Sequence, residues 1–175
     1  MYKQLVILLA AASLTACSEK EEVAQVQTAP VEKAETTLQA YKSQAKSLLA
    51  DIRTQNTAQE LEKSSANLVK TSRKLLSEFT VKYPQCQTYL GALDAAADLI
   101  PTLPLEEIET GYHADGKLPK FDDPVCYHAK DLLVHPATVQ AIAKQGFKSE
   151  SAYQDAELEI VEVIAHFDQV ERALN

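Results

Sequence analysis

Residues 34–79 decide the fold of this chain, and they read AETTLQAYKSQAKSLLADIRTQNTAQELEKSSANLVKTSRKLLSEF. Apolar and small residues recur there at steps of three and four, at Ala34, Leu38, Tyr41, Ala45, Leu48, Leu49 and Ile52, and again at Ala58, Leu61, Ser65, Leu68, Ser72, Leu75 and Phe79. Such spacing places each set on one face of an α-helix. Asn56-Thr57 interrupts the pattern, and Thr57 with Glu60 forms a capping-box pattern for the second helix. The stretch therefore predicts an antiparallel helical hairpin.

The rest of the chain also has the composition and spacing of helices. Glycine occurs only four times, Trp is absent, and no stretch alternates apolar and polar residues as a strand would. Pro84 ends the second helix and suits the first turn of the next, whereas Pro136 is expected to split or kink the helix that begins near Pro124. We therefore predict an all-α fold, an antiparallel helical bundle of four main helices plus a kinked segment.

The N-terminus has the pattern of a targeting signal. Leu5 to Ala12 form an uncharged apolar run of eight residues behind Lys3, and Leu14-Thr15-Ala16-Cys17 follows shortly after. The run is too short to span a membrane, which takes roughly 20 residues, but it is typical of a secretory signal peptide. This N-terminus resembles the bacterial lipoprotein signal. The resemblance implies a signal peptide at residues 1–16 that is removed, and a diacylglycerol thioether on Cys17.

The lipoprotein resemblance also predicts the subcellular location of the protein. Ser18 after Cys17 favours the outer membrane, with acyl chains anchoring the protein and the body facing the periplasm; exposure at the cell surface stays open. Residues 17–30 are polar and predict a flexible tether, and residues 31–175 form a single domain. The alternative is an ordinary cleaved signal with an incidental cysteine.

The formal net charge of −8 argues against nucleic acid as a partner.

Two cysteines are left once Cys17 carries lipid. Cys86 and Cys126 then face an oxidising compartment, so we predict a disulfide between them. The alternatives are two unpaired thiols or a redox-active pair, but the chain lacks the Cys-x-x-Cys spacing that tunes redox thiols. The two cysteines begin the predicted third and fourth helices, so a disulfide would pin both helix starts at one end of the bundle.

The long connection between these helices, residues 101–123, is our first candidate for a binding surface, because long irregular connections in compact domains are often functional. Candidate metal ligands in and beside it are Glu109, His113, Asp122 and His128. Solvated or structural roles for these residues are the alternative interpretation. Asp123 already has a role as a helix cap.

Other chemistry is sparse in the sequence. Glu162 and His166 share one helical face, but their spacing departs from the Glu-x-x-His motifs of di-iron four-helix proteins and the predicted inward stripe contains neither. The chain lacks a phosphate-binding loop, a Gly-x-Ser-x-Gly elbow and a His-Glu-x-x-His zinc motif, so we do not expect an enzyme. We expect no cofactor besides the covalent lipid on Cys17.

The sequence thus favours a membrane-anchored periplasmic lipoprotein that acts as a binding or scaffold module for an envelope protein. The alternative is a small-ligand or metal-binding lipoprotein that uses residues 105–128.

Overall fold

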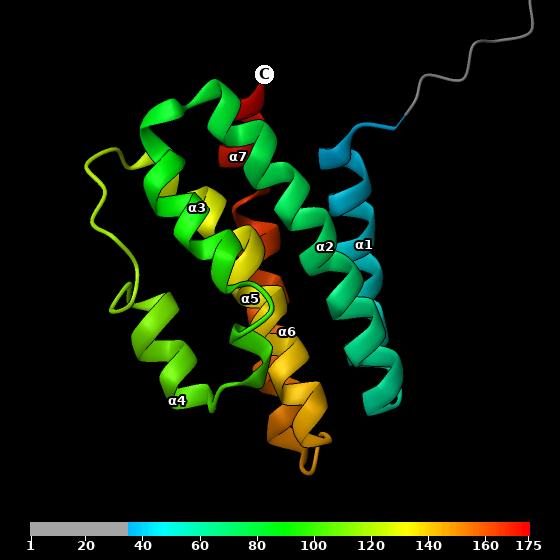
Figure 1. The fold of residues 1–175 in the computed structure, drawn as a ribbon. Coiled ribbons are helices and arrows are strands. Elements are labelled where there is room, and N and C mark those ends of the chain that lie inside the picture. The colour runs from blue at the N-terminus through cyan, green and yellow to red at the C-terminus, as the bar shows by residue number, and fades with distance from the viewer. Residues whose placement is uncertain (1–34) are drawn as a thin grey trace, which may run out of the picture. The chain divides into compact units, whose positions relative to one another are not determined.

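A computed structural model describes residues 35–175, which form α-helices, 3₁₀ turns and one π-helical turn, without a β-strand in this range (Figure 1). The predicted all-α bundle and its disulfide are confirmed. The predicted signal peptide, Cys17 and the tether lie outside the described residues.

The helical hairpin consists of α1 (Thr37–Arg53) and α2 (Ala58–Lys82), which lie side by side in Figure 1. The predicted capping box starts α2: the Glu60 N–H donates to the Thr57 hydroxyl oxygen, and the Thr57 N–H donates to the Glu60 carboxylate at 3.0 Å. Because the caps satisfy the first free N–H groups, the chain reverses within a few residues.

The segment after α2 is built from short helical pieces. They are a 3₁₀ turn at Pro84–Cys86, α3 at Gln87–Ala96, a 3₁₀ turn at Ile100–Thr102, α4 at Leu105–Ile108 and a π-helical turn at Glu109–His113. The predicted long connection to the next helix is present, and it contains α4 and the π-helical turn. A disulfide between Cys86 and Cys126 joins the start of α3 to the start of α5.

The central element is α5 (Val125–Gln145), which is buried along most of its length. We expected Pro136 to split or kink this helix, and the structure shows that Pro136 does not split it: α5 continues through Pro136 as one element. The hydroxyl groups of Tyr41 and Ser72 donate to the carbonyl oxygen of Leu132, which proline leaves without its helical N–H donor. Hydrogen bonds from neighbouring helices therefore keep the helix intact.

The chain ends with α6 (Glu150–Ala165) and α7 (Phe167–Leu174), which meet at His166. Gly146 caps the C-terminus of α5, because it has a left-handed φ of 91° and its N–H bonds back to the last turn. Apolar side chains pack on two sides of α5: one core cluster lies toward α1 and α6, and the other toward α3 and the connection. Among the described residues, no helix combines the length and apolar character that a membrane span requires.

Candidate functional site

Two polar stripes face each other across the packing of α5 against α6. Each stripe has its members at steps of three and four residues, so they lie on one helical face. The stripe on α5 consists of His128, Asp131 and His135, and the stripe on α6 consists of Glu159, Glu162 and the residue that follows the helix, His166. Together with His113 they bring all four histidines of the chain into one region.

One end of this region is formed by His128, Asp131 and His166, which we call the orphan cluster. One ligand atom from each lies within 4.8 Å of the other two. The side chain of Asp131 is 3% exposed, and Nδ1 of His166 lies 2.9 Å from its Oδ2. The rings of His128 and His166 have centroids 5.1 Å apart.

Each side chain of the orphan cluster has a buried polar atom without a hydrogen-bond partner among the described residues. Nδ1 of His128, Oδ2 of Asp131 and Nδ1 of His166 are buried and have no hydrogen-bond partner among the described residues. The short approach of His166 to Asp131 thus lacks the direction of a hydrogen bond. Each such orphan costs about 1–3 kcal/mol of stability and calls for an explanation. These three atoms are the ones that a shared cation would satisfy.

Burial, followed by the nearby His166, holds the pKa of His128 below its ordinary value. The ring is therefore neutral at pH 7, with a lone pair on one nitrogen. A neutral imidazole with a free lone pair is the form that binds metal ions.

The other end of the region is formed by His113, His135 and Glu159, which we call the paired cluster. One ligand atom from each again lies within 4.8 Å of the others. Here, however, Nδ1 of His135 lies 2.6 Å from Oε2 of Glu159, and Nε2 of His113 lies 3.0 Å from the hydroxyl oxygen of Thr138. These contacts give one ring nitrogen of each histidine in the paired cluster a hydrogen-bond partner without a cation.

The pKa values of the two histidines in the paired cluster are shifted in opposite directions. Burial lowers the pKa of His113, although the Glu159 carboxylate partly opposes this effect. Burial also lowers the pKa of His135, but the hydrogen bond and charge of Glu159, together with the Asp131 charge, outweigh it and raise the pKa. The hydrogen bond between His135 and Glu159 therefore joins α5 to α6.

A buried lysine fixes the π-helical turn beside the site. Nζ of Lys130 donates to the backbone oxygen of His113 at 2.7 Å and lies 3.2 Å from Oδ1 of Asp115. It also lies 4.2 Å from the centre of the Tyr127 ring. Asp115 is held in turn by the Tyr89 hydroxyl, which donates to its Oδ1 at 2.7 Å. Lys130 therefore positions His113, since it holds the backbone of that residue.

The structure brings together only some of the ligands that the sequence suggested. His113 and His128 both reach the region, but they belong to different clusters. Glu109 and Asp122 are exposed and belong to neither cluster. The connection of residues 101–123 thus supplies one histidine to the region, and the two long helices supply the rest.

Sequence reasoning did not assign Asp131, His135, Glu159, Glu162 or His166 as candidates. In particular, Glu162 and His166 do face α5, contrary to our expectation from the apolar stripe of α6: Oε2 of Glu162 lies 3.7 Å from Nε2 of His135. The available signal was the pair of polar stripes, His-x-x-Asp-x-x-x-His on α5 and Glu-x-x-Glu-x-x-x-His on α6. On α5 these polar residues stand among buried positions, which makes them candidates for a functional site.

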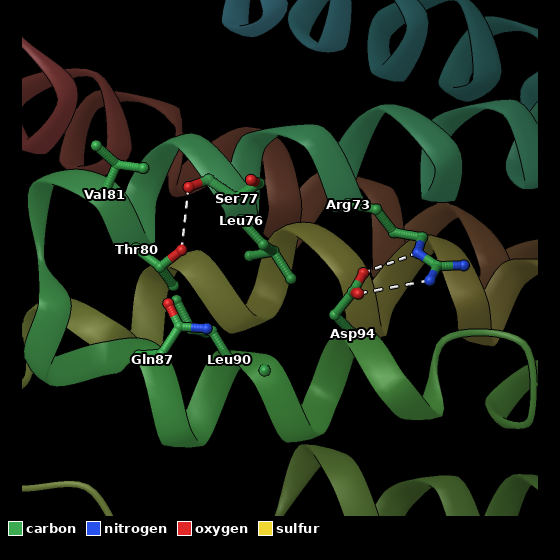
Figure 2. Close-up of a pocket in the computed structure, with 9 residues that line it drawn as sticks. Arg73, Leu76, Ser77, Thr80, Val81, Gln87, Leu90 and Asp94 are labelled. Atoms are coloured by element: carbon green, nitrogen blue, oxygen red, sulfur yellow. Dashed lines mark hydrogen bonds and ion pairs between the residues drawn. The ribbon is translucent and has the colours of Figure 1, made fainter.

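A groove between α2 and α3 is a second surface feature (Figure 2). It has a volume of about 270 Å³, and Leu76, Leu90 and Val81 contribute its apolar lining. At one end, Nε of Arg73 lies 2.7 Å from Oδ1 of Asp94. Val81 is 81% exposed at the other end, so the groove offers apolar surface to solvent.

No known family model matches this chain, and comparison with curated proteins and with solved structures finds no similar protein. The fold and the site define a disulfide-linked helical bundle with a histidine–carboxylate cluster between two of its helices. Its function is therefore inferred from this geometry.

Proposed function

We propose that this protein is a lipid-anchored envelope protein that binds a divalent transition-metal ion through His128, Asp131 and His166. The observation that carries the proposal is the coincidence of three buried polar atoms without hydrogen-bond partners among the described residues, one from each of these side chains. Two imidazoles and a carboxylate suit Zn²⁺ and Fe²⁺. Three protein ligands leave a further position for water or another ligand.

The geometry needs only a small adjustment to hold such an ion. Two ligands at about 2.1 Å from one ion are at most about 4.2 Å apart, compared with the 4.8 Å limit within which the cluster lies. His166 is the residue best placed to move, because it lies at the break between α6 and α7 and its side chain is 27% exposed. Its ring can therefore adjust toward an ion that is held by His128 and Asp131.

Zinc titration of the chelator-treated protein tests the metal function. We expect the melting temperature to rise with Zn²⁺ concentration and calorimetry to detect binding, because an ion that binds the folded state stabilises it by about 2.7 kcal/mol at 100 times its Kd. His166→Ala should abolish tight binding at the orphan cluster. His113→Ala is the matched control, since it removes a neighbouring histidine outside the three ligands. Equal zinc binding by the wild-type protein and His166→Ala would contradict the proposal.

Anchoring rests on the sequence, since Cys17 precedes the described residues. The lipoprotein-like signal ending at Cys17 supports a covalent diacylglycerol and attachment to the outer membrane, with the domain facing the periplasm. Cys17→Ser should release the protein from the membrane fraction. Continued fractionation of this variant with outer membranes would refute lipid anchoring.

Binding of an envelope protein is our second proposal, and the α2–α3 groove supports it. Val81 at the end of this groove is 81% exposed and offers an apolar side chain that a partner would shield from water. A photo-crosslinking residue at position 81 should capture one envelope protein. Leu158 on α6, which is 57% exposed, provides the control position on another helix. The same crosslinks from both positions would argue against a specific partner at the groove.

A further inference from the structure

The side chain of Asp131 lies between two histidines, and its two oxygens point to different neighbours. Oδ2 lies 2.9 Å from Nδ1 of His166 in the orphan cluster, and Oδ1 lies 3.9 Å from Nε2 of His135. A carboxylate placed in this way is able to ligate a different cation with each oxygen. We infer that the site holds two divalent cations, with Asp131 as the bridging ligand and with His135 and Glu162 as the additional ligands of the second cation.

This inference rests on the proposed metal function, since the first cation is the one at the orphan cluster. The second cation would be held by Nε2 of His135, Oδ1 of Asp131 and Oε2 of Glu162. Nε2 makes no hydrogen bond within residues 35–175, and its ring is 5% exposed. Its neighbours are the two carboxylate oxygens, at 3.9 Å for Asp131 and 3.7 Å for Glu162.

These spacings fit a shared ion better than direct hydrogen bonds. Hydrogen bonds from nitrogen to oxygen span about 2.7–3.2 Å, so the observed 3.7 and 3.9 Å are too long. Two ligands on one ion with bonds of about 2.1 Å are separated by up to about 4.2 Å. Asp131 and His135 come from adjacent turns of α5 and Glu162 comes from α6, so both helices supply ligands.

Glu159 orients His135 for this role. Nδ1 of His135 lies 2.6 Å from Oε2 of Glu159, which fixes the ring so that Nε2 points toward Asp131 and Glu162. Metal-binding histidines commonly donate their second ring N–H to a carboxylate in this manner. The hydrogen bond between Glu159 and His135 is then the support of the second cation. Binding the ion replaces the proton on Nε2, as metal binding to an imidazole requires.

The charges around the position favour cations. The carboxylates of Asp131, Glu159 and Glu162 surround His135. Nζ of Lys130 lies 3.9 Å from Oδ1 of Asp131, but it also pairs with Asp115 at 3.2 Å. Ions that share a bridging carboxylate in two-metal sites lie about 3.5–4 Å apart, and such a pair clamps one small anionic ligand between them. The class of ligand that fits the open positions is therefore an oxyanion or water.

Metal stoichiometry separates this inference from the proposed function. The full chain with its disulfide intact is loaded with Zn²⁺, passed through a desalting column and analysed for metal by mass spectrometry. We expect two equivalents in the wild-type protein and one equivalent in Glu162→Gln. Glu162 is half-exposed, so this variant should fold normally, as checked by circular dichroism. Glu106→Gln, which removes an exposed carboxylate on α4, is the matched control and should retain two equivalents.

Each other outcome has a definite meaning. One equivalent in the wild-type protein, unchanged by Glu162→Gln, overturns the second cation and leaves the proposed function intact. Two equivalents in both proteins also overturn the inference, because the second ion then lies elsewhere. No bound zinc overturns both the inference and the proposed function.

Bridging of the two cations by Asp131 is tested separately by electron paramagnetic resonance. With two equivalents of Cu²⁺, electron paramagnetic resonance should show a spin-coupled pair, including a half-field signal, which Glu162→Gln should lose. Two equivalents of Cu²⁺ that give only isolated-ion spectra would contradict bridging by Asp131.

Discussion

The hydroxyl group of Tyr41 on α1 donates a hydrogen bond to the backbone carbonyl oxygen of Leu132 on α5 at 2.8 Å. This oxygen lacks a helical donor because the residue four positions later is Pro136, which has no N–H. The Ser72 hydroxyl donates to the same oxygen. Burial, the largest influence on Tyr41, raises the pKa of its hydroxyl far above the ordinary value, so it remains a donor at every accessible pH. Two helices thus replace the hydrogen bond that proline removes.

Tyr41→Phe should therefore destabilise the protein by about 1–2 kcal/mol, because a buried carbonyl loses one of its donors. In a Pro136→Ala background the new backbone N–H at position 136 can serve that oxygen, so the same Tyr41→Phe change should cost less. Urea unfolding of the four proteins in this double-mutant cycle measures the difference. Strict additivity of the two substitutions would show that Tyr41 does not compensate for the proline.

The disulfide between Cys86 and Cys126 should contribute about 4 kcal/mol to the free energy of unfolding, by the loop-closure argument for a separation of 40 residues. Urea unfolding with and without a reductant, in the Cys17→Ser background, measures this contribution while leaving no other thiol in the chain. An unchanged unfolding midpoint after complete reduction would contradict the prediction.

Lys130→Met should lower the free energy of unfolding by about 3 kcal/mol, because it leaves Asp115 and the His113 carbonyl without their buried partner. Amide hydrogen exchange should accelerate most in residues 109–118, which the ammonium group holds. Lys148→Met replaces an exposed lysine and should change stability by less than about 0.5 kcal/mol. If both variants unfold alike, Lys130 does not fasten the connection.

The capping box of α2 predicts a pH dependence at Glu60. A hydrogen bond from the Thr57 hydroxyl, with a further one from the Thr57 N–H, lowers the pKa of Glu60 below its ordinary value. The folded pKa is then lower than the unfolded one. The cap therefore stabilises the fold fully above the unfolded pKa and is lost as the pH falls through the folded pKa.

A carboxyl carbon NMR titration measures the pKa of Glu60 directly. Thr57→Ala should raise it toward the ordinary value, whereas Thr57→Ser keeps the hydroxyl and should preserve the shift. A Glu60 titration that is identical in all three proteins would refute the capping interaction.

Much of the fold was predictable because its causes are local. The three- and four-residue periodicity of residues 34–79, the Thr57–Glu60 cap and the Gly146 C-cap act within one or two helical turns. The continuity of α5 through Pro136 was not predictable, since the hydroxyl groups that replace its missing donor come from residues distant in the chain. The break between α6 and α7 at His166 also lacks a signal in the apolar spacing, which continues from Tyr153 to Leu174.

The candidate site was only partly predictable for the same reason. His113 and His128 were recognisable as metal-ligand types, but their partners Glu159, Asp131 and His166 are determined by the packing of α5 against α6. Apolar periodicity describes which face of a helix is buried. It does not describe which polar residues on two buried faces meet, or at what distance.

The sequence by itself determined the helical class, the helix boundaries marked by caps, and the pair of cysteines available for a disulfide, because periodicity, capping and thiol number are properties of short segments or of composition. Only the tertiary structure decided that α5 passes through Pro136 and that the titratable side chains of two helices converge around Asp131. The physical reason is that these features depend on distances between residues far apart in the chain, which are fixed only when the helices pack.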